Sequence, residues 1–208
     1  MPDRSDPAAG QVLIATNNKA KLREYRQILA GLPFALTSLD EQGIDVEVPE
    51  TGETFAENAV LKAEAYARLS GLPTLADDSG LEVDALGGEP GVRSARHAGE
   101  GASDRDRIDL LLSRLRDVPW EKRTARFRCV IAIAMPENQT RVVEGQVEGL
   151  IAFEPKGTGG FGYDPVFFLP DLGRSMAELA PEEKNRLSHR ARAGEAARKV
   201  LTSWNDGG

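Results

Sequence analysis

The pattern that most limits the fold is an early alternation of short apolar runs with amphipathic helical segments. Residues 11–16, QVLIAT, are predicted as a strand, and residues 19–30, KAKLREYRQILA, as a helix after a polar loop. A second strand at residues 34–39 and a helix from residue 55 to residue 70 continue the alternation. Such a chain is expected to fold as an α/β protein, because each helix needs a sheet face to cover its apolar side.

The second half of the chain adds a different signal. Residues 124–136 and 140–153 are two long apolar runs joined by the polar turn ENQ, and they predict an antiparallel pair of strands. Together with the earlier alternation, this pair predicts an α/β fold around a mixed sheet. We expect residues 1–10 and the final NDGG to be disordered ends.

Composition excludes several classes of protein. The formal net charge is -7, from 26 Lys and Arg against 33 Asp and Glu, whereas nucleic-acid binders usually carry a basic excess. Cys129 is the single cysteine, so no internal disulfide forms and a reducing compartment is expected. No apolar run has the length of a membrane span, and the polar start is unlike a signal peptide. We therefore expect a cytoplasmic protein that binds neither nucleic acid nor membrane.

The segment LADDSG, residues 75–80, contains an acidic cluster directly after its apolar start. Asp77, Asp78 and Ser79 are predicted to stand at the end of a short strand, with a further strand at residues 81–86. One interpretation is a plain turn, since Asp, Ser and Gly are turn formers. The other is a site for a hard divalent cation beside a phosphate, because adjacent carboxylates hold such ions.

Two further loops precede helices. ATNNKAK leads a strand into a helix, where backbone N–H groups and lysines attract anions, although an Asn helix cap explains the same residues. PETGETF places Glu50 before a helix with capping-box spacing between Thr54 and Glu57. Asn58 and Lys62 share one face of that helix and could meet phosphate, but a solvated face is the default interpretation.

Two loops near the end of the chain complete the set. GTGGFGYDP combines glycines with Phe161 and Tyr163, which fits either a ring stacked on a nucleobase or aromatic residues directed into the core. EEKNRLSHRA brings Lys184, His189 and Arg190 to the start of the last helix, which Ser188 is predicted to cap. Together the loops contain what a nucleoside phosphate with Mg²⁺ requires: carboxylates, lysines at helix starts and an aromatic ring.

At this point the sequence resembles a known family, the inosine/xanthosine triphosphate pyrophosphatases. The motifs that carry the resemblance occur in the order of that family and span residues 12–190: VLIATNNKAKLREY, ETGETFAENAVLKA, ADDSGLEVDALGGEPGVRSAR, GTGGFGYDPVFF and EEKNRLSHR. The resemblance implies a homodimer whose residues 11–204 form a single domain of two lobes. It implies an elongated fold around a long twisted mixed sheet with flanking helices, and a nucleotide cleft between the lobes.

The resemblance also implies an activity. Deaminated purine triphosphates (ITP, dITP and XTP) are hydrolysed to the monophosphate and pyrophosphate with Mg²⁺, which removes them from the nucleotide pool. Two alternatives stay open: a nucleotide-sensing module that binds without turnover, and a pyrophosphatase for other modified nucleotides. The carboxylates argue against the first, because they repel phosphate unless a metal lies between.

The family motifs assign roles residue by residue. Glu50 and Asp78 match the metal positions, and Asp78 also matches the proposed catalytic base. The substrate-binding positions are Thr16, Asn17, Asn18, Lys19, Ala20, Lys21, Ser79, Phe161, Gly162, Tyr163, Asp164, Lys184, His189 and Arg190. Phe161 would stack on the purine, and the His189–Arg190 pair would lie near its 6-oxo edge. The family often has glycine where Asn17 and Ala20 stand, which leaves the shape of the first loop open.

Overall fold

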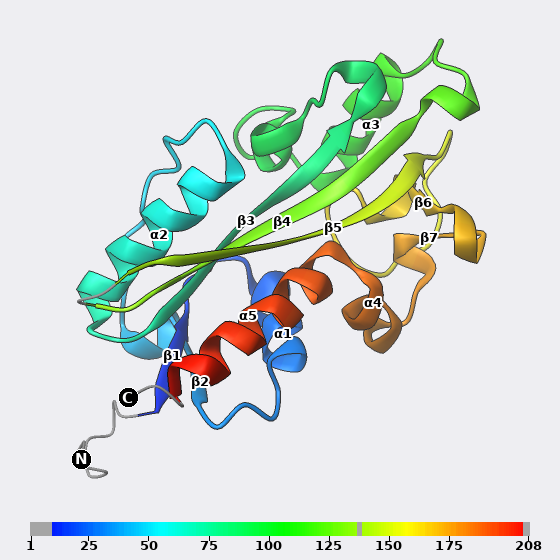
Figure 1. Cartoon of the computed structure of the whole chain (residues 1–208). Coiled ribbons are helices and arrows are strands. Elements are labelled where there is room, and N and C mark those ends of the chain that lie inside the picture. Colours follow the sequence, from blue (N-terminus) through cyan, green and yellow to red (C-terminus); the bar gives the residue numbers. More distant parts are fainter. Residues whose placement is uncertain (1–9, 137–138, 206–208) are drawn as a thin grey trace. The chain divides into compact units, whose positions relative to one another are not determined.

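The computed structural model describes residues 10–136 and 139–205. The expected disorder of residues 1–9 and 206–208, and most of the expected turn ENQ, therefore lie outside the described residues. The helices are α1 (Lys19–Ile28), α2 (Phe55–Ser70), α3 (Asp104–Arg114), α4 (Pro181–Leu187) and α5 (His189–Asn205). The strands are β1 (Gln11–Ile14), β2 (Ala35–Ser38), β3 (Thr74–Val83), β4 (Thr124–Ala134), β5 (Arg141–Ile151), β6 (Phe167–Leu169) and β7 (Arg174–Ser175) (Figure 1).

The strands form a seven-stranded sheet in the order β2-β1-β3-β4-β5-β6-β7. β1 pairs in parallel with β2 and with β3, whereas β6 pairs in antiparallel fashion with β5 and with β7. The sheet is therefore mixed and helices flank it, which confirms the α/β fold class predicted from the sequence. No helix in the described part of the chain combines the length and the apolar character that a membrane span requires.

Local sequence signals explain where the helices begin. α2 starts with a capping box, in which the Thr54 side chain accepts from the N–H of Glu57 and the Glu57 side chain accepts from the N–H of Thr54. Gly71, in the left-handed conformation that glycine tolerates best, ends the same helix. Ser188 accepts from the N–H of Ala191 at 3.2 Å, so it caps α5 as the sequence predicted. The buried apolar stripe of α2 contains Phe55, Ala59, Ala63, Tyr66 and Ala67.

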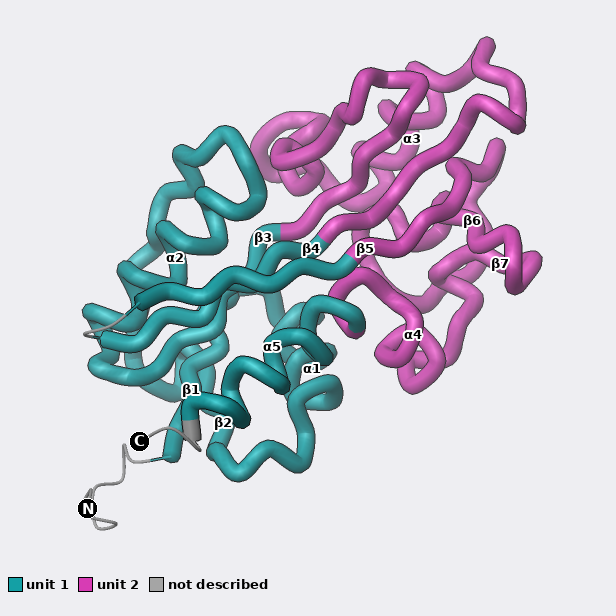
Figure 2. The backbone as a smooth tube through the Cα atoms, in the orientation of Figure 1, with its two compact units in different colours: residues 1–78, 129–145, 192–208 teal, residues 79–128, 146–191 magenta. Residues whose placement is uncertain are grey.

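The chain divides into two compact units, which Figure 2 colours separately. Unit 1 contains residues 1–78, 129–145 and 192–208, and unit 2 contains residues 79–128 and 146–191. Each unit has its own hydrophobic core. That of unit 1 gathers apolar residues from β1, β3, β4, α1 and α5, and that of unit 2 from β3, β4, β5, β6 and α3.

Strand β3 is where the structure corrects the sequence analysis. The segment ADDSG was predicted to end a strand in a turn, but β3 continues without interruption from Thr74 to Val83. β3 has β1 on one side of it in the sheet and β4 on the other. β1 pairs with β3 at Thr74 and Leu75, at the start of the strand. The place of β3 within the sheet keeps the segment extended, and this outweighs the weak local preference of Asp, Ser and Gly for turns.

Candidate active site

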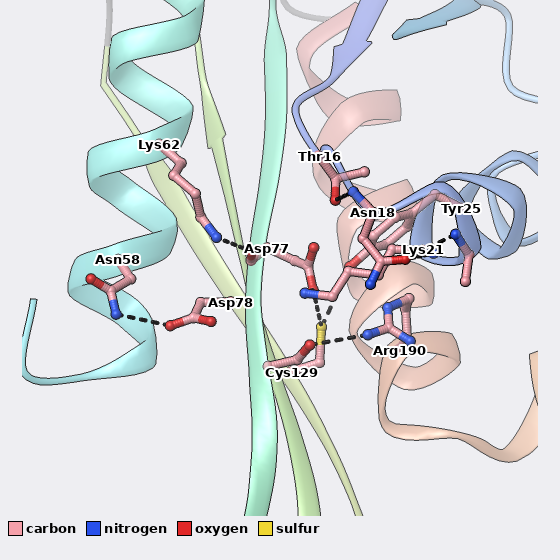
Figure 3. A network of polar contacts seen from close by, with 12 residues as sticks. Thr16, Asn18, Lys21, Tyr25, Asn58, Lys62, Asp77, Asp78, Cys129 and Arg190 are labelled. Carbon is pink, nitrogen blue, oxygen red and sulfur yellow. Dashed lines mark hydrogen bonds and ion pairs between the residues drawn. The ribbon is translucent and has the colours of Figure 1, made fainter. Parts of the chain in front are cut away.

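The two consecutive aspartates of β3 lie on opposite faces of the sheet. Successive side chains of a strand point to opposite faces, so Asp77 is directed towards α1 and Asp78 towards α2 (Figure 3). Asp77 and Asp78 are both buried, at 2% and 6% exposure. The acidic pair is therefore divided between two polar environments within unit 1.

The α2 side holds what we call the carboxylate cluster: Glu50, Asn58, Lys62 and Asp78. The Asn58 amide donates to Asp78 Oδ2 at 3.0 Å. One turn along the helix, Lys62 Nζ donates to Glu50 Oε1 at 2.5 Å and to the backbone oxygen of Asp77 at 2.7 Å. The cluster thus ties the loop before α2, the helix itself and strand β3 together.

Glu50 is held because its loop is fastened to the start of α2. The N–H of Gly52 donates to Asn58 Oδ1 at 2.7 Å, and the N–H of Glu53 donates to Glu57 Oε2 at 2.7 Å. A Cβ at position 52 would lie 2.7 Å from Glu57 Cβ and 2.8 Å from Asn58 Oδ1, so only glycine fits there. Asn58 consequently contacts both the loop that bears Glu50 and the carboxylate of Asp78.

The cluster changes the acidity of its members. Burial raises the pKa of Asp78, the charge of Lys62 and the Asn58 hydrogen bond act against this rise, and Glu50 adds to it. For Lys62, burial would lower the pKa, but the carboxylates of Asp77, Glu50 and Asp78 raise it instead. The negative charges around Lys62 thus stabilise its protonated, positively charged form.

The donor set of the carboxylate cluster fits Mg²⁺. Across the described residues, no group of three or more His, Cys, Asp or Glu side chains could hold a metal ion. Mg²⁺ does not require such a cage, since it keeps several waters and binds through one or two carboxylates together with substrate phosphates. Glu50 and Asp78 supply two hard oxygen ligands, and the ammonium of Lys62 shows that a cation is accommodated beside Glu50.

The loop between β1 and α1 is a capped helix start. Asn18 Oδ1 accepts from the N–H groups of Ala20 at 2.9 Å and Lys21 at 3.1 Å, and Thr16 Oγ1 accepts from the N–H of Asn18. Ala20 already lies within the helix, and no described residue other than glycine has a positive φ, so alanine imposes no strain there. The predicted phosphate contact of Asn18 therefore competes with its function as the helix cap.

Lys21 extends from this helix to the other face of β3. Its Nζ lies 2.9 Å from Asp77 Oδ2, in an ion pair whose side chains are 16% and 1% exposed. The Cys129 thiol lies 3.9 Å from the same Asp77 oxygen and 3.5 Å from the Tyr25 hydroxyl (Figure 3). Asp77 thus fixes the ammonium of Lys21, while Asn17 and Lys19 remain exposed beside it.

Unit 2 contains a second group, which we call the phenylalanine cluster: Ser79, Phe161, Asp164, Lys184 and Arg190. Asp164 Oδ2 accepts from the N–H of Phe161 at 2.9 Å and from Lys184 Nζ at 2.5 Å. The partly exposed ring of Phe161 has Lys184 Nζ at 4.7 Å and the Arg190 guanidinium at 5.4 Å from its centre. Arg190 also donates to Ser79 Oγ at 3.0 Å, so one positively charged group links the ring to strand β3.

The remaining predicted residues of unit 2 are placed differently. Tyr163 belongs to the hydrophobic core and donates to the backbone oxygen of Ser94 at 3.2 Å, and burial raises the pKa of its hydroxyl to about 12. His189 is buried with its ring stacked on Phe127, at 4.7 Å between centres. Gly162 donates its N–H to Asp104 at 2.7 Å. Tyr163 and His189 therefore support the loop and the helix start from inside.

The default interpretation of the sequence placed Asn58 and Lys62 on a solvated face. In the structure, Asn58 contacts Asp78 and Lys62 contacts Glu50, which are the two predicted metal ligands. A signal was present, because the stripe of Phe55, Ala59 and Ala63 is interrupted by these two polar residues at helical spacing. Polar residues within a buried stripe need buried partners. Asp104 was missed as well, and its spacing carries no such signal.

The fold and the two clusters define the class of the protein: an α/β protein with a mixed sheet, in which charged side chains gather along strand β3 and at the start of α5. The chain belongs to the Ham1 family, whose model matches residues 12–200, and this span contains every predicted site residue. The family relationship expected from the motifs is thereby confirmed.

Named relatives and solved structures agree with this assignment. The chain is 56% identical over 183 residues to a dITP/XTP pyrophosphatase of Geobacillus kaustophilus, which covers 88% of this chain and 90% of the relative. It is 49% identical over 191 residues to a dITP/XTP pyrophosphatase of Bacillus subtilis, covering 92% and 96%. The structure of a HAM1 protein from Coxiella burnetii superimposes with a TM-score of 0.85 at 44% identity, covering 93% of this chain and 98% of that one.

Proposed function

We propose that this protein hydrolyses deaminated purine nucleoside triphosphates, ITP, dITP and XTP, to the monophosphate and pyrophosphate. The observation that carries the proposal is the carboxylate cluster, in which Glu50 and Asp78 are held beside Lys62 within a chain that matches the Ham1 family over residues 12–200. Relatives that are 49–56% identical in sequence over most of the chain are named dITP/XTP pyrophosphatases. Removal of these nucleotides from the pool would be the cellular consequence.

In this proposal Glu50 and Asp78 hold Mg²⁺. When bound, the ion would neutralise charge on the phosphate oxygens and the leaving pyrophosphate. Asp78 is the proposed acceptor, at a carboxylate oxygen, of the proton that the attacking water loses when the bond between the α- and β-phosphates is cleaved. Asn58 orients that carboxylate through its hydrogen bond to Oδ2.

The phosphates are the proposed ligands of the helix start in unit 1. Lys21, fixed by Asp77, would place its ammonium against phosphate oxygens, and preorganised charge of this kind stabilises a transition state without reorganisation. The other predicted contacts there are Thr16, Asn17, Asn18, Lys19 and Ala20. Asn17 and Lys19 are exposed and therefore accessible to a ligand.

The purine is the proposed ligand of the phenylalanine cluster. The ring of Phe161 would stack on the base, and a donor from Arg190 or the adjacent backbone would meet the 6-oxo group. Adenine presents an amino group at this position, so its N–H would face another donor. A site built to donate a hydrogen bond rejects such a substrate.

The test is a panel of ITP, dITP, XTP, ATP and GTP, each assayed for phosphate with and without added inorganic pyrophosphatase. We expect phosphate from ITP and XTP only when the pyrophosphatase and Mg²⁺ are both present, and turnover of ATP at least about tenfold lower. Phosphate released without the pyrophosphatase would mean a different cleavage. Equal turnover of ATP and ITP would refute the proposed recognition of the oxo group.

The two alternatives give different results in the same assay. A nucleotide-sensing module would bind ITP without releasing pyrophosphate, and an enzyme for other modified nucleotides would prefer a substrate outside the purine panel. Asp78→Asn serves as the control for the proposed catalytic residue. If its ITP hydrolysis stays within about tenfold of the wild type, a loss of only ~1.4 kcal/mol, the function of Asp78 is wrongly assigned.

We also propose a cytoplasmic homodimer, from the family resemblance together with the acidic composition and the single cysteine. Light scattering coupled to gel filtration should give twice the 22.5 kDa mass of the chain. A mass that stays at the monomer value across concentrations would contradict the dimer.

A further inference from the structure

Lys62 is the cation of the carboxylate cluster and contacts Glu50 directly. Its side chain is 13% exposed, and its ammonium donates to Glu50 Oε1 at 2.5 Å and to the backbone oxygen of Asp77 at 2.7 Å. In Figure 3 it extends from α2 towards β3, on the side of the strand where Asp78 lies. The carboxylates of Asp77, Glu50 and Asp78 all act on its charge.

Asp78 is buried and the side chain of Glu50 is 30% exposed, so repulsion between their two negative charges is only partly screened by water and the pair needs positive charge nearby. In the protein without ligand, the ammonium of Lys62 supplies that charge. A divalent ion at Glu50 and Asp78 would supply it as well, and would need the Glu50 oxygen that Lys62 now holds. Two cations therefore compete for one anionic site.

We infer that Lys62 is a resident counterion of the carboxylate pair, and that it must leave Glu50 before a divalent metal ion can bind there. The inference rests on the proposed function, which assigns Glu50 and Asp78 as metal ligands. Its consequence is an order of events: the free protein binds the free ion weakly, and the ion is taken up together with the nucleotide. The phosphates then provide new partners for the displaced ammonium.

A merely structural function of Lys62 predicts the opposite sign. If Lys62 only anchors the Glu50 loop to β3, its removal disorders a metal ligand and lowers the affinity for metal. If Lys62 competes with the ion, its removal raises that affinity. The sign of the change in metal affinity, measured without nucleotide, separates the two explanations.

The experiment measures binding of Mn²⁺ alone to the full chain by electron paramagnetic resonance of the free ion. We expect Lys62→Met to lower the Mn²⁺ dissociation constant at least about tenfold, equivalent to ~1.4 kcal/mol. Lys62→Gln, which keeps N–H donors for Glu50 and the Asp77 carbonyl, should show the same gain and guards against misfolding of the Met variant. An unchanged or higher dissociation constant in both folded variants overturns the inference.

Two controls locate the effect. Lys21→Met removes a half-buried lysine that is paired with Asp77 on the opposite face of the same strand, so it reports the general effect of one lost positive charge. Its gain should be clearly smaller than that of Lys62→Met, and an equal gain would refute direct competition. Adding Glu50→Gln to Lys62→Met should abolish the gain, whereas a retained gain would mean that the ion binds elsewhere.

Failure of this inference is distinguishable from failure of the proposed function. If the wild type hydrolyses ITP with Mg²⁺ but the Lys62 variants gain no Mn²⁺ affinity, the proposed activity is supported and the counterion function of Lys62 is refuted. If the variants gain Mn²⁺ affinity but the wild type hydrolyses none of the panel nucleotides, the counterion function of Lys62 is supported and the proposed activity is refuted.

Discussion

At the scale of single residues, strand geometry explains why Asp77 and Asp78 have different partners. Because neighbouring side chains of β3 point to opposite faces, Asp77 pairs with Lys21 while Asp78 joins Asn58 and the carboxylate cluster. The two residues are chemically identical, and only their faces differ. Asp77 is therefore a positioning residue for Lys21, and Asp78 is the residue proposed to touch water and metal.

Replacement of Asp78 should separate stability from activity. Burial raises the pKa of Asp78, so the native protein holds the proton more tightly than the unfolded chain does, and stability falls as pH rises from the unfolded pKa through the folded one. At neutral pH the buried charge is thus a cost that asparagine does not carry. We expect Asp78→Asn to raise the free energy of unfolding by about 0.5–2 kcal/mol while ITP hydrolysis is lost.

The measurement is urea unfolding in a metal chelator at pH 7, since bound metal would stabilise only the wild type. The gain of the variant should shrink as the pH is lowered below the unfolded pKa of the carboxyl, where Asp78 is protonated in both states. A variant less stable than the wild type at pH 7 would show that the charge of Asp78 supports the fold.

Asp77 should behave differently, because its buried carboxylate is the partner of the half-buried ammonium of Lys21. Asp77→Asn leaves Lys21 without that charge; breaking a fully buried ion pair costs about 3–5 kcal/mol, and the partial exposure of Lys21 should keep the loss below that range. We expect lower stability in urea unfolding and a higher KM for ITP, since Lys21 is no longer fixed. Lys21→Met in the Asp77→Asn background should recover part of the stability but not the KM. A double variant no more stable than Asp77→Asn would contradict this.

At the scale of elements, helix packing sets where α1 lies, the helix whose start is proposed to bind the phosphates. Gly194 of α5 faces Ile28 of α1, and a Cβ there would come within 2.4 Å of Ile28 Cγ2. Arg198 of α5 donates to the backbone oxygens of Ile28 and Ala30 at the end of α1. Close approach of the two helices and this C-terminal contact together hold the helix whose start carries Asn18 and Lys21.

Gly194→Ala should therefore weaken the fold through one contact. Overpacking of this kind costs about 1–3 kcal/mol, measured as the loss of unfolding free energy in urea. Ile28→Ala removes the opposing methyl group, so the double variant should lose less than the sum of the two single losses. Strict additivity in this double-mutant cycle would mean that Ile28 is not what the new methyl group meets.

At the scale of the whole molecule, two hydrophobic cores are connected by β3, β4 and β5, each of which contributes residues to both units. The predicted phosphate and metal residues belong to unit 1 and the predicted base residues to unit 2. Asp78 and Ser79 are the last and first residues of the two units on β3, and one peptide bond joins them. A nucleotide that binds the folded protein and not the unfolded chain should raise the stability of the protein.

This stabilisation can be measured by thermal unfolding with an ITP analogue that resists cleavage between the α- and β-phosphates. At a hundred times its dissociation constant the analogue with Mg²⁺ should add about 2.7 kcal/mol. For a chain of this size that corresponds to a rise of about 5–10 °C in Tm. The matching ATP analogue should give a smaller rise, and a chelator should remove most of the effect. A rise that survives the chelator would contradict a metal-assisted site.

The sequence by itself determined much of this protein. Capping residues Thr54 and Ser188, the apolar stripes of α1 and α5, and the ordered motifs predicted the elements, the mixed α/β sheet and the family. These features are readable because caps and periodic stripes depend on neighbours a few residues away in the chain. The same locality explains why Asn18 could be weighed in advance as a helix cap, which it is.

Only the tertiary structure decided how the acidic segment is used. The residues ADDSG have the local preference of a turn, and pairing of β3 in the sheet makes them a strand that separates Asp77 from Asp78. The contact of Lys62 with Glu50 joins residues twelve positions apart, and that of Asn58 with Asp78 joins residues twenty apart. Such contacts depend on how a helix docks on a sheet, and no local preference of the chain specifies that docking.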